Sequence, residues 1–154
     1  MICLRPFRQA DVSTLYEIDH VCFATGIAYS KTELRYYLQH PSAFTVIAED
    51  RHRGIVGFCI AQFDKYAGRW IGHIITIDVI PASRRTGVGH MLMAAMDTCF
   101  HAKSVNTVEL EVAVDNLSAQ AFYAHFGFTI IGRIPDYYPG HLDAFVMQKR
   151  LKPA

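Results

Sequence analysis

A glycine-rich segment with two arginines is the part of this sequence best suited to hold an anion. It reads Pro81-Ala82-Ser83-Arg84-Arg85-Thr86-Gly87-Val88-Gly89-His90 and lies between a predicted strand and a predicted helix. Two glycines at such a junction let the backbone approach a ligand closely, and the first amides of the helix point outward with the positive end of its dipole. The pattern predicts a pyrophosphate-binding loop. The alternative is that Gly87 and Gly89 serve only a tight turn.

Two other nucleotide-binding loops fit these residues poorly. A P-loop ends in Gly-Lys-Ser/Thr, whereas this segment continues as Gly89-His90-Met91. A Rossmann fingerprint needs three spaced glycines early in a parallel βαβ unit, which is not the order here. The sequence therefore disfavours Mg-nucleotide and dinucleotide binding.

Three side chains outside the loop could move protons. Glu111 alternates with apolar residues on a predicted strand, and Tyr123 lies on the apolar stripe of the following helix. On pattern alone, a solvated carboxylate and a core tyrosine are the alternatives to catalytic roles. His73 titrates near pH ~6.5 when unperturbed, so it could relay protons or be structural.

Hydrophobic periodicity defines the elements that must position these groups. Asp11, Ser30 and Asn116 are expected helix N-caps, with Ser30 and Glu33 at capping-box spacing. A final hairpin is expected around a loop at 135–140. The predicted strands cover residues 2–4, 43–49, 55–63, 70–80, 107–114, 128–133 and 145–151, and the predicted helices cover about 12–19, 31–38, 88–103 and 117–126.

Composition indicates one globular domain spanning residues 1–154, with no linker or repeat. The chain is 51% hydrophobic and carries 15 basic against 14 acidic side chains. Such a balance argues against nucleic-acid binding through a broad cationic face. No apolar run approaches the ~20 residues of a membrane span, and no signal peptide is recognisable, so a cytoplasmic location is expected.

Cysteine and histidine spacing predicts no metal site. The four cysteines, Cys3, Cys22, Cys59 and Cys99, lie far apart in apolar surroundings and are expected to be reduced and mostly buried. The eight histidines show no ligand spacing such as His-Glu-x-x-His.

Together the motifs resemble a known family. Arg84-Arg85-Thr86-Gly87-Val88-Gly89 is similar to the acetyl-CoA loop of the GCN5-related N-acetyltransferases (GNAT). The resemblance runs over nearly the whole chain and is sharpest to RimI-like protein N-terminal acetyltransferases. It is carried by Leu110-Glu111-Val112, Asn116, Ala121-Phe122-Tyr123, Gly127-Phe128, Tyr137-Tyr138-Pro139 and Asp143-Ala144.

The resemblance implies a fold and a cofactor site. The fold is α/β (α+β), with a mixed, mostly antiparallel central sheet splayed at the cofactor site and helices on both faces. The pyrophosphate of acetyl-CoA would bind the segment 84–90, and its pantetheine arm would pair with the backbone of Ile77, Asp78 and Val79. Asn116 would also contact the pantetheine.

The resemblance also implies catalytic roles and a substrate. Glu111 would be the general base and Tyr123 the general acid, while His73 is a possible second base. A peptide α-amine with pKa ~8 is about 10% neutral at pH 7, whereas a lysine is about 0.04% neutral, so a modest base suffices for the former. Tyr137 and Tyr138, together with Phe23, Ile27 and Tyr29 in the loop 23–29, would clamp the substrate N-terminus.

Three functions remain open on these residues. The first is acetyl transfer from acetyl-CoA to the N-terminus of a protein or peptide, possibly a ribosomal protein, through a ternary complex. The second is acetylation of a small amine, and the third is acyl-CoA binding without catalysis. Gly26-Ile27-Ala28-Tyr29-Ser30 replaces an aromatic-Pro-Trp-Ser run frequent in RimI-like enzymes, so the preferred first residue stays open, as does the oligomeric state.

Overall fold

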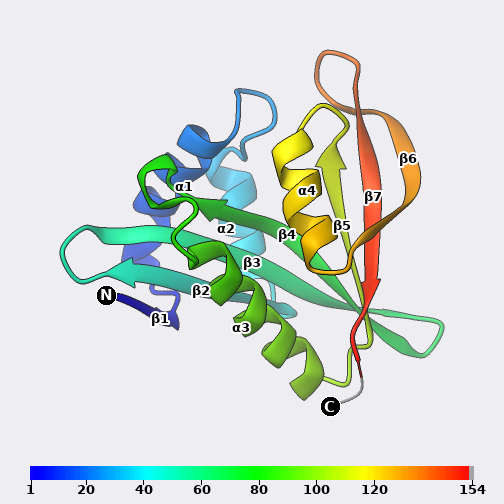
Figure 1. Cartoon of the computed structure of the whole chain (residues 1–154), viewed down its shortest axis with the longest axis horizontal. Helices are drawn as coiled ribbons and strands as arrows, with labels where there is room; N and C mark the ends of the chain where they lie inside the picture. The colour runs from blue at the N-terminus through cyan, green and yellow to red at the C-terminus, as the bar shows by residue number, and fades with distance from the viewer. Residues whose placement is uncertain (153–154) are drawn as a thin grey trace. The chain divides into compact units, whose positions relative to one another are not determined.

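Alternating apolar residues form seven strands, which order as β1-β2-β3-β4-β5-β7-β6 in a mixed sheet (Figure 1). This computed structural model describes residues 1–152. The strands are β1 (Ile2–Pro6), β2 (Ala43–Asp50), β3 (Gly54–Tyr66), β4 (Arg69–Val79), β5 (Thr107–Ala113), β6 (Thr129–Tyr138) and β7 (Leu142–Arg150). The α-helices are α1 (Val12–Cys22), α2 (Lys31–Gln39), α3 (Val88–Ala102) and α4 (Leu117–His125), and short 3₁₀ turns are η1 (Gln9–Asp11) and η2 (Pro81–Ser83).

Strand pairing confirms the expected mixed, mostly antiparallel sheet. β1–β2, β2–β3, β5–β7 and β6–β7 pair antiparallel. β4 and β5 pair in parallel, in a ladder from Ile71↔Thr107 to His73↔Glu109. A parallel pair needs a crossover connection, and the segment containing α3 supplies it.

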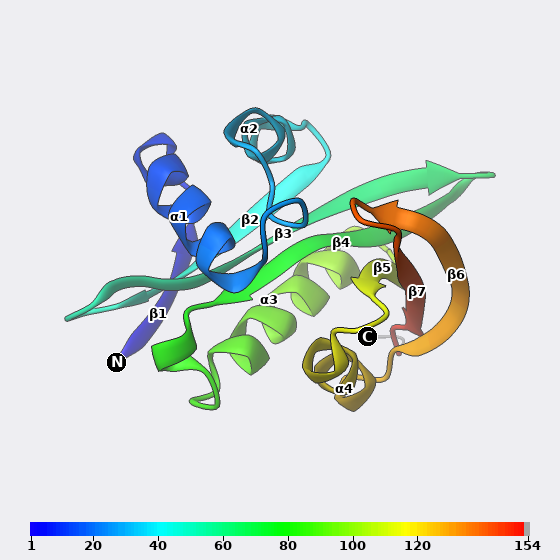
Figure 2. The same cartoon turned by 90° about the horizontal axis from the view of Figure 1, so that it is seen from above.

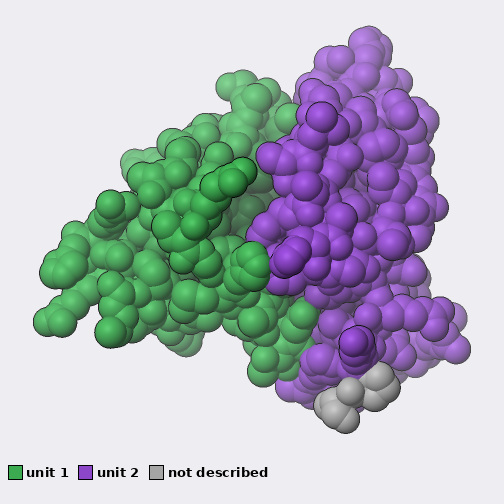
Figure 3. Space-filling model, in the orientation of Figure 1, with its two compact units in different colours: residues 1–62, 74–99 green, residues 63–73, 100–154 purple. Residues whose placement is uncertain are grey.

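The chain divides into two compact units (Figure 3). Unit 1 contains residues 1–62 and 74–99, and unit 2 contains residues 63–73 and the chain from Phe100 onward. In unit 1, α1 and α2 cover one face of the strands and α3 covers the other (Figure 2). Its core is a buried cluster of Leu15, Ile18, Leu34, Ile47, Phe58 and Ile60.

In unit 2, the final hairpin is longer than the sequence predicted. β6 continues through Pro135 to Tyr138, so the expected loop at 135–140 is wrong except for its last turn. β6 is an edge strand of the sheet, so one of its sides pairs with no neighbour. A proline is tolerated there because its missing N–H costs no hydrogen bond between strands. Asp136, at φ 52°, introduces an irregularity, and its N–H donates to Asp143 Oδ1 at 2.9 Å.

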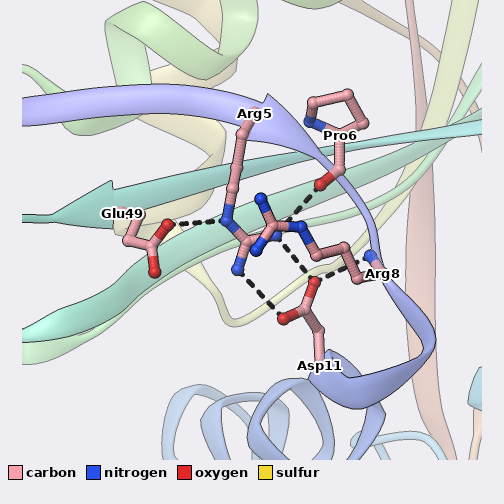
Figure 4. Close-up of polar contacts among 5 residues, drawn as sticks. All are labelled: Arg5, Pro6, Arg8, Asp11 and Glu49. Atoms are coloured by element: carbon pink, nitrogen blue, oxygen red, sulfur yellow. Dashed lines mark hydrogen bonds and ion pairs between the residues drawn. The ribbon is translucent and has the colours of Figure 1, made fainter.

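Local capping signals were largely correct. Ser30 and Glu33 form the predicted reciprocal capping box of α2, and Asn116 Oδ1 accepts from Ala119 N–H at 3.2 Å. Asp11 occupies the predicted N-cap position of α1, but its carboxylate makes no cap bond to that helix. It binds the Arg5 guanidinium through both oxygens, at 2.9 and 3.0 Å (Figure 4).

The network around Arg5 ties the first strand to the start of α1. Arg5 Nε donates to Glu49 on β2 at 2.6 Å, and Asp11 also accepts from Arg8 N–H. The guanidinium bond holds the pKa of Asp11 below its usual range. We expect Asp11→Ala to lower the free energy of unfolding by about 2 kcal/mol, because it leaves partly buried donors unpaired. Urea denaturation measures this, with exposed Glu17→Ala as control; equal losses would contradict it.

The remaining compositional expectations have mixed outcomes. All four cysteines are free thiols, but only Cys59 is buried and Cys3 is exposed, so the expectation of mostly buried thiols is wrong. Within residues 1–152, no grouping of three or more His, Cys, Asp or Glu could hold a metal ion. No helix in that range is both long and apolar enough to span a membrane.

Candidate active site

The predicted pyrophosphate loop is an exposed turn of unit 1 that leads into α3. Arg85 and Gly87 have positive φ values of 61° and 89°, which turn the backbone between η2 and the helix. Thr86 Oγ1 donates to the Ser83 carbonyl at 2.5 Å and braces the turn. Because α3 begins at Val88, its first N–H groups lack intrahelical acceptors. Exposed Arg84 and Arg85 accompany these amides, so the residues present fit an anionic phosphate.

The end of β4 is fixed against this loop by its own backbone carbonyl. Val79 C=O accepts from Arg84 Nε at 2.9 Å and from Cys22 Sγ at 3.4 Å. Ile77 and Val79 are partly exposed, whereas the Asp78 side chain is buried. The strand predicted to pair with the pantetheine arm is therefore anchored by side chains of α1 and of the loop.

Gly57 on β3 is a site residue that sequence reasoning missed. A Cβ at this position would lie 2.6 Å from the Asp78 carbonyl oxygen and 3.3 Å from Val88 Cγ1. The absence of a side chain thus lets β3 approach β4 and the start of α3. A strand glycine signals close backbone approach, and that signal could have identified it.

We expect Gly57→Ala to displace the backbone at Asp78, and so both to destabilise the protein and to weaken acetyl-CoA binding. The expected loss is about 1–3 kcal/mol in the free energy of unfolding, with a several-fold rise in KM for acetyl-CoA. Urea denaturation and steady-state kinetics check the two effects. Gly132→Ala is the matched control, because its added Cβ meets nothing within 4 Å. Equal behaviour of the two variants would refute the close-approach argument.

In unit 2, the β4–β5 ladder brings the two base candidates together. His73 pairs with Glu109 in register, and Glu111 lies two positions further along β5. His73 Nε2 lies 2.9 and 3.1 Å from the two Glu111 carboxylate oxygens. Since a carboxylate only accepts, Nε2 carries the proton in this contact. Glu111 is 19% exposed, so it is not the solvated carboxylate that pattern alone favoured.

The two tyrosines of β6 lie at the same carboxylate. The Tyr137 hydroxyl donates to Glu111 Oε1 at 3.1 Å, and its ring packs edge-on against Tyr138 with centroids 4.9 Å apart. Burial and the negative charge of Glu111 raise the pKa of Tyr138 to about 12. The Tyr138 phenol therefore remains protonated near neutral pH, and the Tyr137 hydroxyl already donates to Glu111.

The His73–Glu111 pair shifts both ionisations. Burial alone would lower the pKa of His73, but the hydrogen bond and charge of Glu111 outweigh burial and raise it above 6.5. Burial alone would raise the pKa of Glu111, but the bond and charge of His73 and the Tyr137 hydroxyl hold it below its usual value. The pair therefore contains a carboxylate that favours its ionised form beside an imidazole whose protonated form it stabilises.

Removing the carboxylate charge should lower the pKa of His73. In wild type we expect the His73 ring to titrate above pH 6.5, and in Glu111→Gln at a clearly lower pH, because burial is then opposed only by the charges of Asp64 and Glu109. NMR titration of the imidazole C–H signals measures both, with His73→Asn assigning the resonance. Tyr137→Phe, which keeps the carboxylate charge, should shift the midpoint much less. An unchanged midpoint in Glu111→Gln would refute the coupling.

The other predicted residues of unit 2 lie on α4. The Tyr123 ring is buried and packs edge-on against Phe122 and Phe128, with centroids 5.5 and 5.7 Å away. Asn116 uses its side-chain oxygen to cap the helix. The general-acid role of Tyr123 and the pantetheine contact of Asn116 stay predictions.

The predicted substrate loop in unit 1 connects α1 and α2. Phe23 ends α1, Ile27 N–H donates to the Ala24 carbonyl, and both side chains are partly exposed. Tyr29 is anchored through its backbone and its hydroxyl, which donates to the Ile75 carbonyl at 3.2 Å. Sequence reasoning missed the main anchor of this loop, the carboxylate of Asp19, which accepts from Tyr29 N–H at 2.7 Å.

The sequence and the fold are similar to those of acyl-transferring proteins. The model of the Acetyltransferase (GNAT) family matches residues 12–128. An uncharacterized N-acetyltransferase of Methanocaldococcus jannaschii is 30% identical over 96% of this chain and 90% of its own length. The NAA10 catalytic subunit of the N-terminal acetyltransferase A complex of Arabidopsis thaliana is 28% identical over 99% of this chain and 79% of its own.

A solved structure shows the same architecture. The ribosomal-protein-S18-alanine N-acetyltransferase of Escherichia coli superposes with a TM-score of 0.84 at 23% identity, covering 100% of this chain and 96% of that one. The chain is therefore an acyltransferase. It belongs to the GNAT family of N-acetyltransferases, as its sequence motifs indicated, and acetyl-CoA is its expected cosubstrate.

Proposed function

We propose that this protein acetylates the N-terminal α-amine of a protein or peptide, by direct transfer from acetyl-CoA in a ternary complex. The observation that carries the proposal is the Glu111 carboxylate, held by His73 and by Tyr137 from β6. N-terminal acetyltransferases among the relatives support the same substrate class.

The proposed reaction needs a neutral amine and a proton for the departing sulfur. Glu111 accepts a proton from the α-amine, whose nitrogen attacks the thioester carbonyl. The carbon–sulfur bond then breaks, and the Tyr123 hydroxyl donates a proton to the thiolate. Because about 10% of an α-amine is already neutral at pH 7, even a carboxylate with a low pKa provides sufficient base strength.

His73 and Tyr137 have positioning roles in this scheme. Their hydrogen bonds fix the orientation of the Glu111 carboxylate, as partners of a general base must. The ionisation of His73 also sets the charge of the pair, so activity should fall as His73 becomes protonated. We assign the first peptide groups of the substrate to the phenols of Tyr137 and Tyr138 and to the loop containing Phe23, Ile27 and Tyr29.

Matched peptides test the proposal. Thiol release from acetyl-CoA, confirmed by mass spectrometry, is compared for a peptide with a free α-amine and one with a blocked α-amine plus lysine. We expect acetylation of the free α-amine alone. Acetylation of polyamines or aminoglycosides but of no peptide would replace the proposal with a small-amine enzyme. Saturable acetyl-CoA binding without turnover on any amine would indicate a binding domain.

Peptides that differ only in their first residue then define specificity. An Ala-initiated peptide belongs in this set because the E. coli structural relative is an alanine N-acetyltransferase. A preference for Ala would favour a target of that kind, including a ribosomal protein. A preference for Met or another residue would argue for a different physiological target.

A further inference from the structure

Two aspartates that the proposed chemistry does not use meet inside unit 1. Asp19 on α1 and Asp78 on β4 are each only 1% exposed, and their carboxyl groups lie against one another. Asp19 Oδ2 accepts from Tyr29 N–H at 2.7 Å, and Asp78 Oδ1 accepts from the Thr76 hydroxyl at 2.5 Å. Within residues 1–152, the remaining oxygens, Asp19 Oδ1 and Asp78 Oδ2, are buried and accept no hydrogen bond from any group of the protein.

This arrangement requires a proton between the carboxyls. Two carboxylates cannot donate to one another, and two like charges in contact away from water are strongly unfavourable. A single proton turns the contact into a hydrogen bond and leaves one negative charge. Burial, followed by the nearby charge of Asp19, raises the pKa of Asp78 well above its ordinary value, which supports a proton at this contact.

Few other ionisable groups act on this pair. Arg84 is the cation that favours its negative charge. Two thiols also face it, Cys22 from α1 and Cys59 from β3, and the buried acids help raise their pKa values, so both thiols are neutral near pH 7. The protonation of the pair therefore decides the local charge.

The pair is connected to the loop that joins α1 and α2. Asp19 holds the Tyr29 N–H, His20 Nε2 contacts the Tyr29 carbonyl at 2.9 Å, and the Tyr29 hydroxyl reaches the Ile75 carbonyl of β4. Asp78 lies three residues after Ile75 on the same strand. The carboxyl pair thus links the loop to the sheet: Asp19 holds the loop at Tyr29, and Asp78 belongs to β4.

We propose that Asp19 and Asp78 share one proton and act together as a positioning element for the loop 23–30. This inference rests on the proposed function, which assigns that loop to the substrate N-terminus. While the proton is present, α1 and the loop stay closed on β4. When alkaline pH removes the proton, the two negative charges repel. The repulsion should displace the loop and not β4, because β4 is hydrogen bonded within the sheet whereas the loop only connects α1 and α2.

Hydrogen exchange of the full chain tests the loop without relying on activity. Exchange of the segment 23–30 is measured from pH 6 to pH 10 and corrected for intrinsic rates. We expect protection in wild type to fall by about tenfold over the alkaline part of this range, as a charge-assisted hydrogen bond is lost. Core segments of β3 serve as the internal reference.

Two substitutions at Asp19 separate the shared proton from simple packing. In Asp19→Asn the amide can accept from Tyr29 N–H and donate to Asp78, so no shared proton remains to be lost and protection should not depend on pH. In Asp19→Ala the loop loses its anchor, and protection should be low at every pH. Glu17→Gln, on the exposed face of α1, should behave as wild type.

Kinetics then connect the loop to substrate. Relative to wild type, Asp19→Ala should raise KM for the peptide about tenfold at pH 7 while kcat and KM for acetyl-CoA stay within about twofold. Taking the ratio of the variant KM to the wild-type KM at each pH removes the effect of the peptide amine's own titration, which is the same for both proteins. In wild type alone, this KM should rise further at alkaline pH.

The outcomes distinguish this inference from the proposed function. Protection that is flat with pH in wild type, or equally pH-dependent in Asp19→Asn, would overturn the shared proton. A peptide KM unaffected by Asp19→Ala would overturn the positioning role. If no peptide is acetylated by wild type, the proposed function fails, and with it the substrate role of the loop, while the exchange data still decide whether the proton controls the loop.

Discussion

Glu111→Gln should lower kcat for peptide acetylation by about 10²-fold or more, with little change in KM for acetyl-CoA. The amide keeps the size of the side chain, and its oxygen can still accept from Tyr137 and His73. It cannot take up a proton from the substrate. The loss should therefore appear in the chemical step, measured as thiol release at saturating concentrations of both substrates.

The pH dependence of the residual activity makes this prediction specific. Without a base, the variant depends on substrate amine that is already neutral, so its rate should rise about tenfold per pH unit until the amine pKa near ~8. Glu109→Gln is the matched control, since Glu109 is a carboxylate of the same strand. It accepts a hydrogen bond from the Gln148 side chain. We expect it to stay within about twofold of wild type. A kcat for Glu111→Gln within threefold of wild type would remove Glu111 as the base.

Tyr123→Phe should also lower kcat by about 10²-fold, with KM for acetyl-CoA nearly unchanged. The substitution keeps the ring that packs between Phe122 and Phe128, and removes only the hydroxyl that would protonate the leaving thiolate. A thioester with a leaving group of much lower thiol pKa should recover part of the rate, because a good leaving group needs less help from an acid.

A folding defect would give a different pattern. The free energy of unfolding of Tyr123→Phe, from urea denaturation, should stay within about 1 kcal/mol of wild type, because packing is retained. Tyr66→Phe, at a tyrosine that is 66% exposed, controls for loss of a phenol elsewhere. Near-normal kcat in Tyr123→Phe, or equal loss for both thioesters, would exclude the general-acid role.

Local chemistry explains which structural predictions succeeded. The capping box of Ser30 and Glu33 forms as expected because its partners lie three residues apart. The turn at Gly87 has the positive φ that its residue type permits. Asp11 makes no cap bond to α1 because its carboxylate is taken up by Arg5, from the preceding strand, and by the Arg8 N–H.

The candidate site needed information that spacing does not contain. His73 and Glu111 were separate candidates for the base, 38 residues apart, until the parallel register of β4 and β5 joined them. Tyr137 was predicted in a loop, but it lies on a strand because β6 continues past Pro135. Gly57 carried the general signal of a glycine within a strand, but only the structure shows that the closely approaching atom is the Asp78 carbonyl oxygen.

The sequence by itself determined the family, the order of elements and the glycine turn that leads into α3, because periodicity, caps and glycine turns act between residues close in the chain. Only the tertiary structure decided which acids meet which partners. The pKa of Glu111 is lowered beside His73, whereas burial beside Asp19 raises the pKa of Asp78, although both are carboxyls on strands. The difference is set by what strand register and helix packing bring against each group, and pairwise electrostatics inside a protein depend on those distances.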